Sequence, residues 1–475
     1  MNIGSCSASG AGTGRSLVRF VWVDALIQRI GREVRPIKQA SDFDDDFASR
    51  YARMYAWMPK SLVVTSVYGT INVRMNAPMF DQPHQFEPLL PSAARQEPLL
   101  AKAHDLALSA SGLASQTLAT ELRGLLRAMN SYYSNRIEGQ HTRPLELEQA
   151  LHQDFSQDAK LAARQRLAVA HIDAEIELEA RFSGAAGVVE VYSAQAVKDI
   201  HRALFSRLPP GNLQTDQGAP INPGTLRDQE VSVGRHVAPM AASVGTFLDR
   251  WASFYCGVRR GDAALVAMAA AHQRLGWVHP FVDGNGRVMR LHTHTLLSAL
   301  GYTGGMWSPL RGFARSVDRY YALLAAADEP RRGDLDGRGN LSESALVDWI
   351  DYVLDVCIDQ VSFMRSMLNL GAIDQRIAAC LTYEQESLKS GVRIEALRPL
   401  HYLFVTGLEI ERGEFKRMTG LGERTAVTVI SALVRRGLLR SDTVQGKVRF
   451  GLPLHALRFY FPALWPEAEA DTAAL

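Results

Sequence analysis

The most informative stretch of the sequence is His279-Pro280-Phe281-Val282-Asp283-Gly284-Asn285-Gly286-Arg287-Val288-Met289-Arg290. Gly284, Asn285 and Gly286 are residue types that tolerate unusual backbone angles, so their consecutive N–H groups can turn inward and form an anion nest. We expect a helix directly after this turn, with the positive end of its dipole facing whatever sits in the nest. The stretch therefore predicts a loop and a helix that together bind a polyphosphate.

The charged residues of this stretch have complementary roles. Arg287 and Arg290 are three residues apart and share a face of the expected helix, so both guanidinium groups can reach the same polyanion. Asp283 is a hard oxygen ligand, placed where a magnesium ion could bridge it to phosphate oxygens. His279, with an unperturbed pKa near ~6.5, can take a proton from an attacking hydroxyl at neutral pH. A plain loop with solvated arginines is the simpler interpretation, but complementary roles in one short stretch favour a site.

The stretch also matches the pattern H-x-F-x-(D/E)-G-N-G-R-x-x-R at all eight fixed positions and resembles the signature of the Fic family of protein adenylyltransferases. The resemblance implies transfer of AMP from ATP to a Ser, Thr or Tyr hydroxyl of a protein, with His279 as general base and Asp283 holding Mg²⁺. Phe281 is expected to pack in the core. The nucleotide site that the resemblance implies consists of Phe281, Gly284, Asn285, Gly286, Arg287, Val288, Met289 and Arg290.

The resemblance covers about residues 130 to 365 and includes His272-Gln273-Arg274 and Trp307 to Leu324. It implies a helical bundle with a small β-hairpin flap at Val231 to Pro239. An exposed strand there could hold a target protein by strand addition, although a purely structural hairpin fits the residues equally well. Tyr321 is a candidate wall for the adenine ring, against the alternative that it packs in the core.

An upstream segment, Ser134-Asn135-Arg136-Ile137-Glu138-Gly139, resembles the (S/T)-x-x-x-E-(G/N) motif of the inhibitory helix in many Fic proteins. Glu138 is an acceptor-only carboxylate that can pair with a guanidinium. If it pairs with Arg290, that arginine is withheld from the γ-phosphate and ATP binds unproductively. The alternative is a surface glutamate followed by a glycine, Gly139, that ends a helix.

Composition limits the remaining possibilities. The chain has 475 residues, which predicts two to four domains at about 100 to 200 residues each. Its net charge of +2 excludes a uniformly basic surface, and its 4 cysteines are too widely spaced for a zinc motif or a disulfide framework. His292 and His294 point to different faces of a helix, so zinc binding there is not expected. No apolar run is long enough for a membrane helix, and we expect a cytoplasmic protein.

Changes in composition divide the chain. We expect a poorly defined segment at 1–80, partly disordered or upstream of the natural start, a helical region at 81–190 with the inhibitory helix at 131–139, and a catalytic core at 191–370. A linker at 371–393, a winged helix at 394–454 and a tail at 455–475 follow. Helical spacing predicts helices at 98–127, 144–153, 158–182, 193–208, 240–256, 262–276, 287–299, 316–327 and 342–370.

The expected winged helix combines short helices at 413–418 and 423–436 with two strands around Gln445-Gly446. Nine basic residues against three acidic ones between Arg412 and Arg449 would suit DNA, but many such units bind proteins instead. The leading hypothesis is thus an autoinhibited, magnesium-dependent adenylyltransferase. The alternative is a DNA-binding transcriptional regulator that uses the nucleotide site as a ligand sensor. Self-modification and a homodimer both stay open.

Overall fold

The computed structural model describes residues 62–66, 69–73, 80–114, 119–368 and 372–464, in a chain that divides into two units, 1–77 and 78–475. The described part of the first unit is an antiparallel hairpin of β1 (Leu62–Ser66) and β2 (Gly69–Val73), in which Leu62 lies opposite Val73. The rest of the predicted poorly defined segment, up to residue 79, lies outside the described residues.

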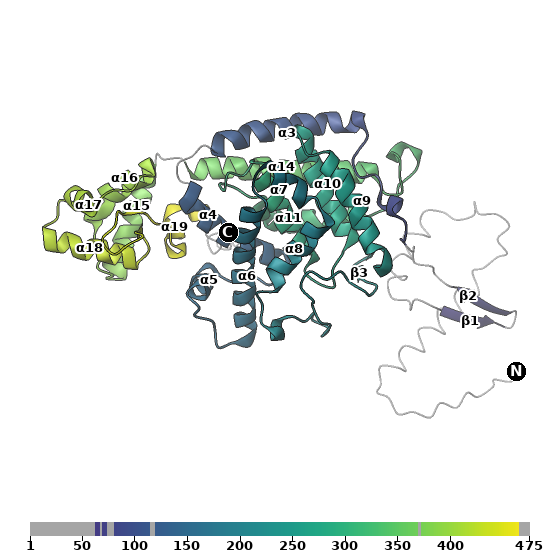
Figure 1. Cartoon of the computed structure of the whole chain (residues 1–475), viewed down its shortest axis with the longest axis horizontal. Coiled ribbons are helices and arrows are strands. Elements are labelled where there is room, and N and C mark those ends of the chain that lie inside the picture. The colour runs from purple at the N-terminus through teal and green to yellow at the C-terminus, as the bar shows by residue number, and fades with distance from the viewer. Residues whose placement is uncertain (1–61, 67–68, 74–79, 115–118, 369–371, 465–475) are drawn as a thin grey trace, which may run out of the picture. The chain divides into compact units, whose positions relative to one another are not determined.

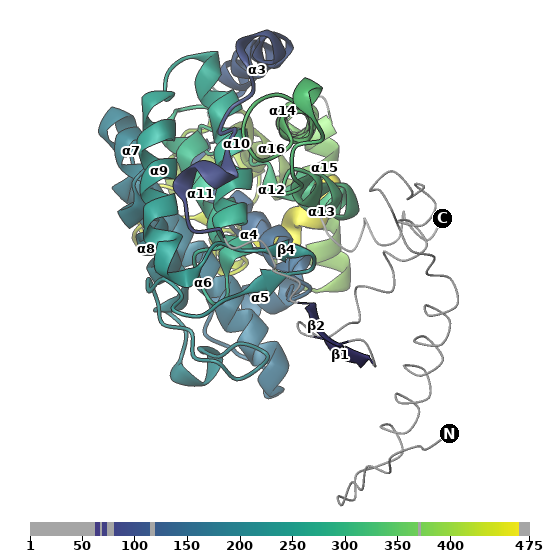
Figure 2. The ribbon, with the colours of Figure 1, turned by 90° about the vertical axis from the view of Figure 1, so that its right-hand side faces the viewer.

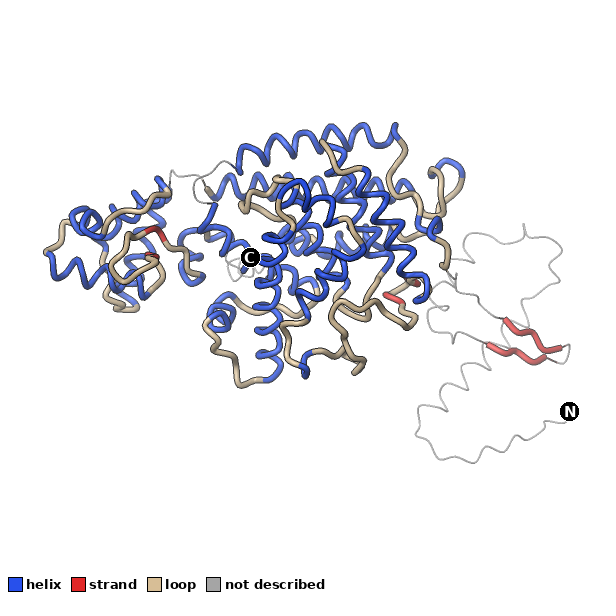
Figure 3. Tube along the Cα trace, viewed as in Figure 1, coloured by secondary structure: helices blue, strands red, loops and turns tan. Residues whose placement is uncertain are grey.

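The second unit is mainly α, as the sequence predicts, and Figure 3 shows how few of its residues lie in strands. Its N-terminal helices are η1 (Pro83–Phe86), α3 (Ala93–Ala114), α4 (Ala119–Ile137), α5 (Pro144–Leu151), α6 (Ala159–Arg181), α7 (Gly184–Val191) and α8 (Ala194–Phe205). After the short turn η2 (Pro210–Asn212) and the hairpin described below come η3 (Ala241–Ser243), α9 (Val244–Gly257), α10 (Asp262–Val278), α11 (Asn285–Ala299), α12 (Leu310–Arg315), α13 (Val317–Ala326), η4 (Asp334–Asp336) and α14 (Glu343–Met367). Among the described residues, no helix has the length and apolarity needed to cross a bilayer.

Helices α10 and α11 lie in the middle of the helical body in both Figure 1 and Figure 2. α10 packs against α3, α9, α11 and α14, and all its residues from Ala264 to Leu275 are buried. They are apolar up to Ala271, after which three buried polar residues follow: His272, Gln273 and Arg274. α11 is equally buried and also carries polar residues, among them Arg290, His292 and His294. Buried polar side chains need partners, and the partners of Arg290 belong to the site.

The expected hairpin is present as β3 (Ser232–Val233) and β4 (His236–Val237), which pair antiparallel across Gly234. Gly234 has a φ of 58°, the left-handed conformation that a tight two-residue turn requires.

The C-terminal part of the second unit differs from the prediction at both ends. The expected linker at 371–393 is wrong, because α15 (Ile373–Thr382) and the π-helical turn η6 (Tyr383–Ser387) lie there and bury Ile377, Cys380 and Leu381. The expected tail from residue 455 is wrong up to residue 464, because η8 (Leu454–Ala456), α19 (Leu457–Tyr460) and η9 (Pro462–Leu464) bury Leu457, Tyr460 and Phe461.

Between these ends lie η7 (Ile394–Ala396), α16 (Leu397–Thr406), α17 (Arg412–Thr419), α18 (Glu423–Arg435), β5 (Leu439–Arg440) and β6 (Arg449–Phe450). The two short helices and the two antiparallel strands follow one another in the predicted order. Assignment of this part as a winged helix stays a prediction.

Candidate active site

The signature stretch forms a rigid loop between α10 and α11. His279 ends α10 in the left-handed conformation, and Gly284 caps the start of α11 with a φ of 81°. A Cβ atom on Gly284 would come within 2.3 Å of the Phe205 ring, so only glycine fits there. The Asn285 side chain accepts from Phe281 N at 2.9 Å and donates to Phe281 O at 2.8 Å, which closes the loop on itself.

A buried histidine that the sequence analysis missed supports this loop from below. His201 accepts a hydrogen bond from Gly224 N at Nδ1, 2.8 Å away, so its Nε2 carries the proton and faces Asp283 O at 3.3 Å. Its ring stacks on Phe281, with centroids 4.0 Å apart and an interplanar angle of 18°. Phe281 therefore lies in the core, as expected, and holds the loop in place.

His279 is positioned by Arg227, which is buried like His201. Arg227 Nε donates to His279 O at 2.8 Å, and the same guanidinium donates to Gln229 O and Pro239 O, the two ends of the hairpin segment. One side chain thus connects the hairpin to the signature loop. Burial, together with the nearby His236 and Arg227, lowers the pKa of His279 to about 4. The imidazole is consequently neutral at pH 7, the state that a general base requires.

A cavity of about 1220 Å³ opens beside His279. It is lined by residues of five parts of the chain, including Gln85, Glu138, Val233 to Val237 of the hairpin, His279, Asn285, Gly286, Met289, Arg290, Tyr321 and Asp328. Tyr321 is 43% exposed and its hydroxyl donates to Ile137 O at 3.1 Å, whereas Tyr320 is fully buried. Seven of the expected site residues do not line the cavity: Ser134, Gly139, Phe281, Asp283, Gly284, Arg287 and Val288.

The end of α4 pairs with both arginines of the signature. Arg290 Nη2 donates to Glu138 Oε1 at 2.6 Å and to Ser134 O at 3.1 Å, and its Nε donates to Ser134 Oγ at 3.1 Å. Arg287 Nε donates to Asn135 Oδ1 at 3.2 Å. Arg287 Nη2 also donates to Gln140 Oε1, and neither contact of Arg287 was predicted from the sequence.

Glu138 lies directly against the start of α11. A Cβ atom on Gly286 would come within 2.3 Å of Glu138 Oε1, so the carboxylate occupies the position where an anion would meet the helix N-terminus. Burial alone would raise the pKa of Glu138, but the charges of Arg290 and Arg287 outweigh it and hold the pKa below its usual range. Glu138 is therefore an ionised group in the expected phosphate position. Gly139, with a φ of 70°, ends this segment in the left-handed conformation.

Two groups of residues bear on metal binding. Asp283 accepts from Gly284 N through Oδ1 and makes no ion pair with any residue that the structure describes, so its second oxygen fits the role of a magnesium ligand. Within the described ranges, one group of side chains has metal-ligand spacing: Glu175 and Glu179 of α6 with His294 of α11. Burial would lower the pKa of His294, but the two carboxylates raise it to about 10, so an imidazolium already supplies the positive charge between them. His292 instead faces Val191 O, which confirms that the two histidines do not share a site.

Comparison with known proteins shows which proteins this site is similar to. Residues 191–297 match the family model described as Fic/DOC family. "Protein adenylyltransferase Fic" of Drosophila mojavensis is 28% identical over 156 residues, which cover 32% of this chain and 28% of that protein. The protein of the same name from Drosophila virilis is 35% identical over 111 residues, covering 23% of this chain and 22% of that protein. The chain thus spans about a quarter of the length of these curated relatives.

Among solved structures, a Fic family protein from Desulfovibrio desulfuricans G20 is similar over 77% of this chain and 98% of that chain, with a TM-score of 0.46 and 16% identity. Fic-1 of C. elegans is similar over 58% of this chain and 73% of that chain, with a TM-score of 0.41 and 17% identity. The sequence match includes the complete signature loop and the helices on either side of it. The segment from residue 191 to residue 297 is therefore similar to the Fic/DOC family domain.

Proposed function

We propose that this chain is a protein adenylyltransferase that transfers AMP from ATP to a Ser, Thr or Tyr hydroxyl of a protein and is inhibited by its own Glu138. The observation that carries the proposal is the neutral His279 beside a helix N-terminus and two arginines, at the edge of a large cavity. The curated relatives named protein adenylyltransferase support the same activity.

His279 is the group that moves a proton in this proposal. Its imidazole takes the proton of the target hydroxyl while the hydroxyl oxygen bonds to the α-phosphorus and the bond to the β-phosphate oxygen breaks. The products are the AMP-modified protein and pyrophosphate. The N–H groups at the start of α11 stabilise the negative charge that develops on the phosphate oxygens, because the first N–H groups of a helix have no acceptor within it. Magnesium, held by Asp283, would neutralise phosphate charge and orient the leaving group.

The nucleotide is proposed to lie along α11, with its phosphates at Gly284 to Gly286 and its γ-phosphate on Arg290. Met289 and Tyr321 line the same cavity and suit an adenine or ribose contact. In the structure, Arg290 is occupied by Ser134 and Glu138, and Arg287 by Asn135 and Gln140. Both cationic groups are therefore withheld from a triphosphate, which is the proposed basis of inhibition.

The hairpin is the proposed binding place of the target protein. Ser232 and Val233 of β3 are exposed, Val233 by 49%, and residues 233 to 237 line the cavity that contains His279. An extended target segment could pair with this strand and bring its hydroxyl to His279.

The C-terminal part is proposed to bind a protein partner rather than DNA. Several of its basic residues are already paired within the chain: Lys416 with Glu423, Arg436 with Glu384, and Arg449 with Glu409 and Asp442. These pairs leave fewer cations for phosphate contacts than the sequence count suggests. This reduces the support for the alternative function, a DNA-binding regulator.

The experiment that tests the proposed function compares the wild type with Glu138→Gly in labelled ATP, followed by mass spectrometry of modified proteins. Glu138→Gly removes the carboxylate and frees Arg290, so we expect AMP transfer to rise about ten- to hundredfold, the worth of one charge-assisted pair. Adding His279→Ala to Glu138→Gly should abolish the transfer. Glu97→Gly, which removes an exposed carboxylate from α3, is the matched control and should change nothing. No transfer by Glu138→Gly would contradict the proposed activity, and equal transfer by the wild type would contradict the inhibition.

A further inference from the structure

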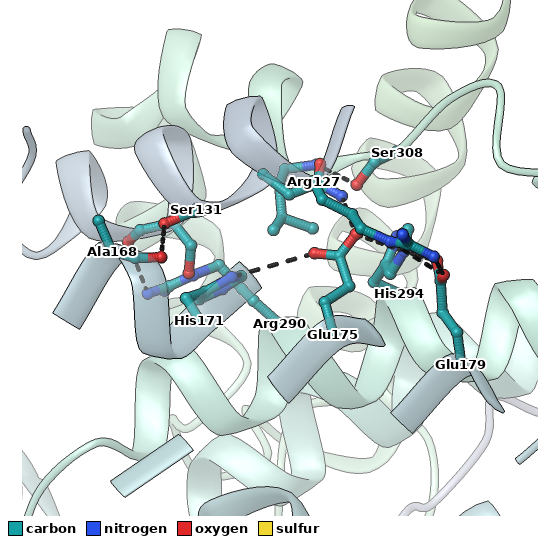
Figure 4. Close-up of polar contacts among 12 residues, drawn as sticks. Arg127, Ser131, Ala168, His171, Glu175, Glu179, Arg290, His294 and Ser308 are labelled. Carbon is teal, nitrogen blue, oxygen red and sulfur yellow. Dashed lines mark hydrogen bonds and ion pairs between the residues drawn. The ribbon is translucent and has the colours of Figure 1, made fainter. Parts of the chain in front are cut away.

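Three helices contribute polar side chains to one row of buried and partly buried groups, which we call the polar seam. Its members lie at three- or four-residue intervals on each helix, so each set shares one helix face. The polar seam consists of Arg127, Ser131 and Ser134 of α4 and Glu138 directly after it, His171, Glu175 and Glu179 of α6, and Arg290 and His294 of α11. Figure 4 shows seven of these side chains between the three helices: Arg127, Ser131, His171, Glu175, Glu179, Arg290 and His294. The sequence motifs include only its inner end, Ser134, Glu138 and Arg290.

The outer end of the polar seam is a cluster of alternating charges. Arg127 donates to Glu179 through Nε at 3.2 Å and also through Nη2. His294 Nε2 lies 3.1 Å from Glu179 Oε1 and 3.2 Å from Glu175 Oε1. Asn130 of α4 donates to Glu175 Oε1 at 2.9 Å. The positive charges of Arg127 and His294 balance the negative charges of the two carboxylates. Arg127 and Asn130 attach α4 to α6.

The inner end of the polar seam is the inhibitory contact itself, Arg290 with Ser134 and Glu138. His171 stands between the two ends: burial and the charge of Arg290 lower its pKa to about 3, so it is a neutral ring. Its Nδ1 lies 4.0 Å from Glu175 Oε2, and neither atom has a hydrogen-bond partner in the described part of the chain. The middle of the polar seam is thus loosely joined, and the firm polar contacts of α4 lie at its two ends.

We propose that Arg127, Glu179, His294 and Glu175 are positioning residues that hold the inhibitory end of α4 against Arg290. The inference rests on the proposed function and names how its inhibition is set. A helix transmits a change at one end to the other because its backbone is stiff, and Arg127 and Glu138 are 11 residues apart on the same face. Without the positive charge of His294, two buried carboxylates repel each other beside Asn130 and Arg127, so the contacts that fix α4 to α6 weaken.

Hydrogen exchange measured on the full chain tests the inference without depending on activity. His294→Gln should raise the exchange rates of the backbone amides of residues 131–139 about tenfold, within the range of coupling between linked sites. His292→Gln is the matched control, because His292 is equally buried on the same helix but bonds Val191 O on another face. Arg127 lies at the partly exposed rim of the cluster, where a substitution disturbs the fold less than at His294. Arg127→Gln should therefore give a smaller rise in the exchange rates of the same amides. Melting curves establish that each variant is folded.

Transfer of AMP gives the second readout. His294→Gln should raise basal transfer, and it should add nothing when combined with Glu138→Gly, because both act on the same contact. If folded His294→Gln and Arg127→Gln leave the exchange of residues 131–139 at the wild-type rate, the cluster is only structural and the inference is wrong. If exchange rises but Glu138→Gly transfers no AMP, the proposed function fails while the positioning role stands.

Discussion

At the scale of a single residue, the low pKa of His279 decides how the reaction should depend on pH. For a histidine with the ordinary pKa of ~6.5, the neutral fraction at pH 5 is about thirtyfold smaller than at pH 8. With a pKa of about 4, His279 stays mostly neutral there, so the loss is less than about twofold. We therefore expect AMP transfer by Glu138→Gly to stay nearly constant between pH 8 and pH 5.

Initial rates of transfer at saturating ATP, measured over this range, check the expectation. Nucleotide binding at each pH is the control, since it separates loss of the base from loss of substrate. A rate that halves near pH 6.5 would show that His279 is less desolvated than the structure indicates, or that another group with an ordinary pKa limits the reaction.

The loop of the signature residues, directly before α11, was predictable because the residues that form it are adjacent in the sequence. His201, Arg227 and Gln140 were not, because each acts on the loop from a different part of the chain, and a single buried His or Arg has no spacing that marks its role. The polar seam could have been found from its four-residue spacing, His171, Glu175 and Glu179, which places three polar residues on one face of a helix that is otherwise buried there.

At the scale of elements, two helices that contain glycines, α7 and α12, were not predicted from the sequence. Gly184 and Gly187 suggest a break, yet α7 forms there because Val188 and Val191 pack into the core. Gly312 interrupts the helical spacing before residue 316, but it lies within α12, where a Cβ would come within 2.5 Å of Val356 of α14. Long periodic helices such as α6 and α14 were predicted to within a few residues, because their apolar spacing is repeated over many turns.

The corrected boundaries of the C-terminal part predict which fragment folds. Residues 394–454 alone lack α15 and α19, which contribute Ile377, Leu381 and Tyr460 to the core of this part. Tyr460 packs on Phe450 with ring centroids 5.5 Å apart. We expect a fragment of residues 372–464 to unfold cooperatively in urea and the fragment 394–454 to show no cooperative transition. Equal unfolding curves for the two fragments would contradict the assigned role of α15 and α19.

At the scale of the whole molecule, buried histidines control how stability depends on pH. Burial lowers the pKa of His171 to about 3 and those of His201, His279 and His292 to about 4, so the unfolded chain binds more protons below pH 6.5. Stability should therefore fall as the pH drops from 6.5 toward 4. Burial raises the pKa of Asp328 to about 7, so this carboxyl group binds a proton in the folded chain first and opposes the fall in stability. It contributes only one proton, against four from the histidines.

The pKa shift of His294 has the opposite sign to those of the other buried histidines, so its effect on stability appears at alkaline pH. Its folded pKa of about 10 lies above the unfolded value of 6.5, so the stability it contributes is fully present below pH 6.5 and is lost as the pH rises toward 10. One proton corresponds to a slope of about 1.4 kcal/mol per pH unit. Urea unfolding of the full chain between pH 7 and pH 8, below the range where cysteines of the unfolded chain titrate, should show this slope in addition to smaller contributions of the same sign from Asp328 and His455, whose folded pKa values are also raised. His294→Gln should reduce the alkaline slope by about 1.4 kcal/mol per pH unit and leave the acid side unchanged, whereas His292→Gln should keep the wild-type slope. An alkaline slope in His294→Gln equal to that of the wild type would mean that the histidine is not charged between Glu175 and Glu179, and the charge balance of the outer cluster would then have to come from another cation.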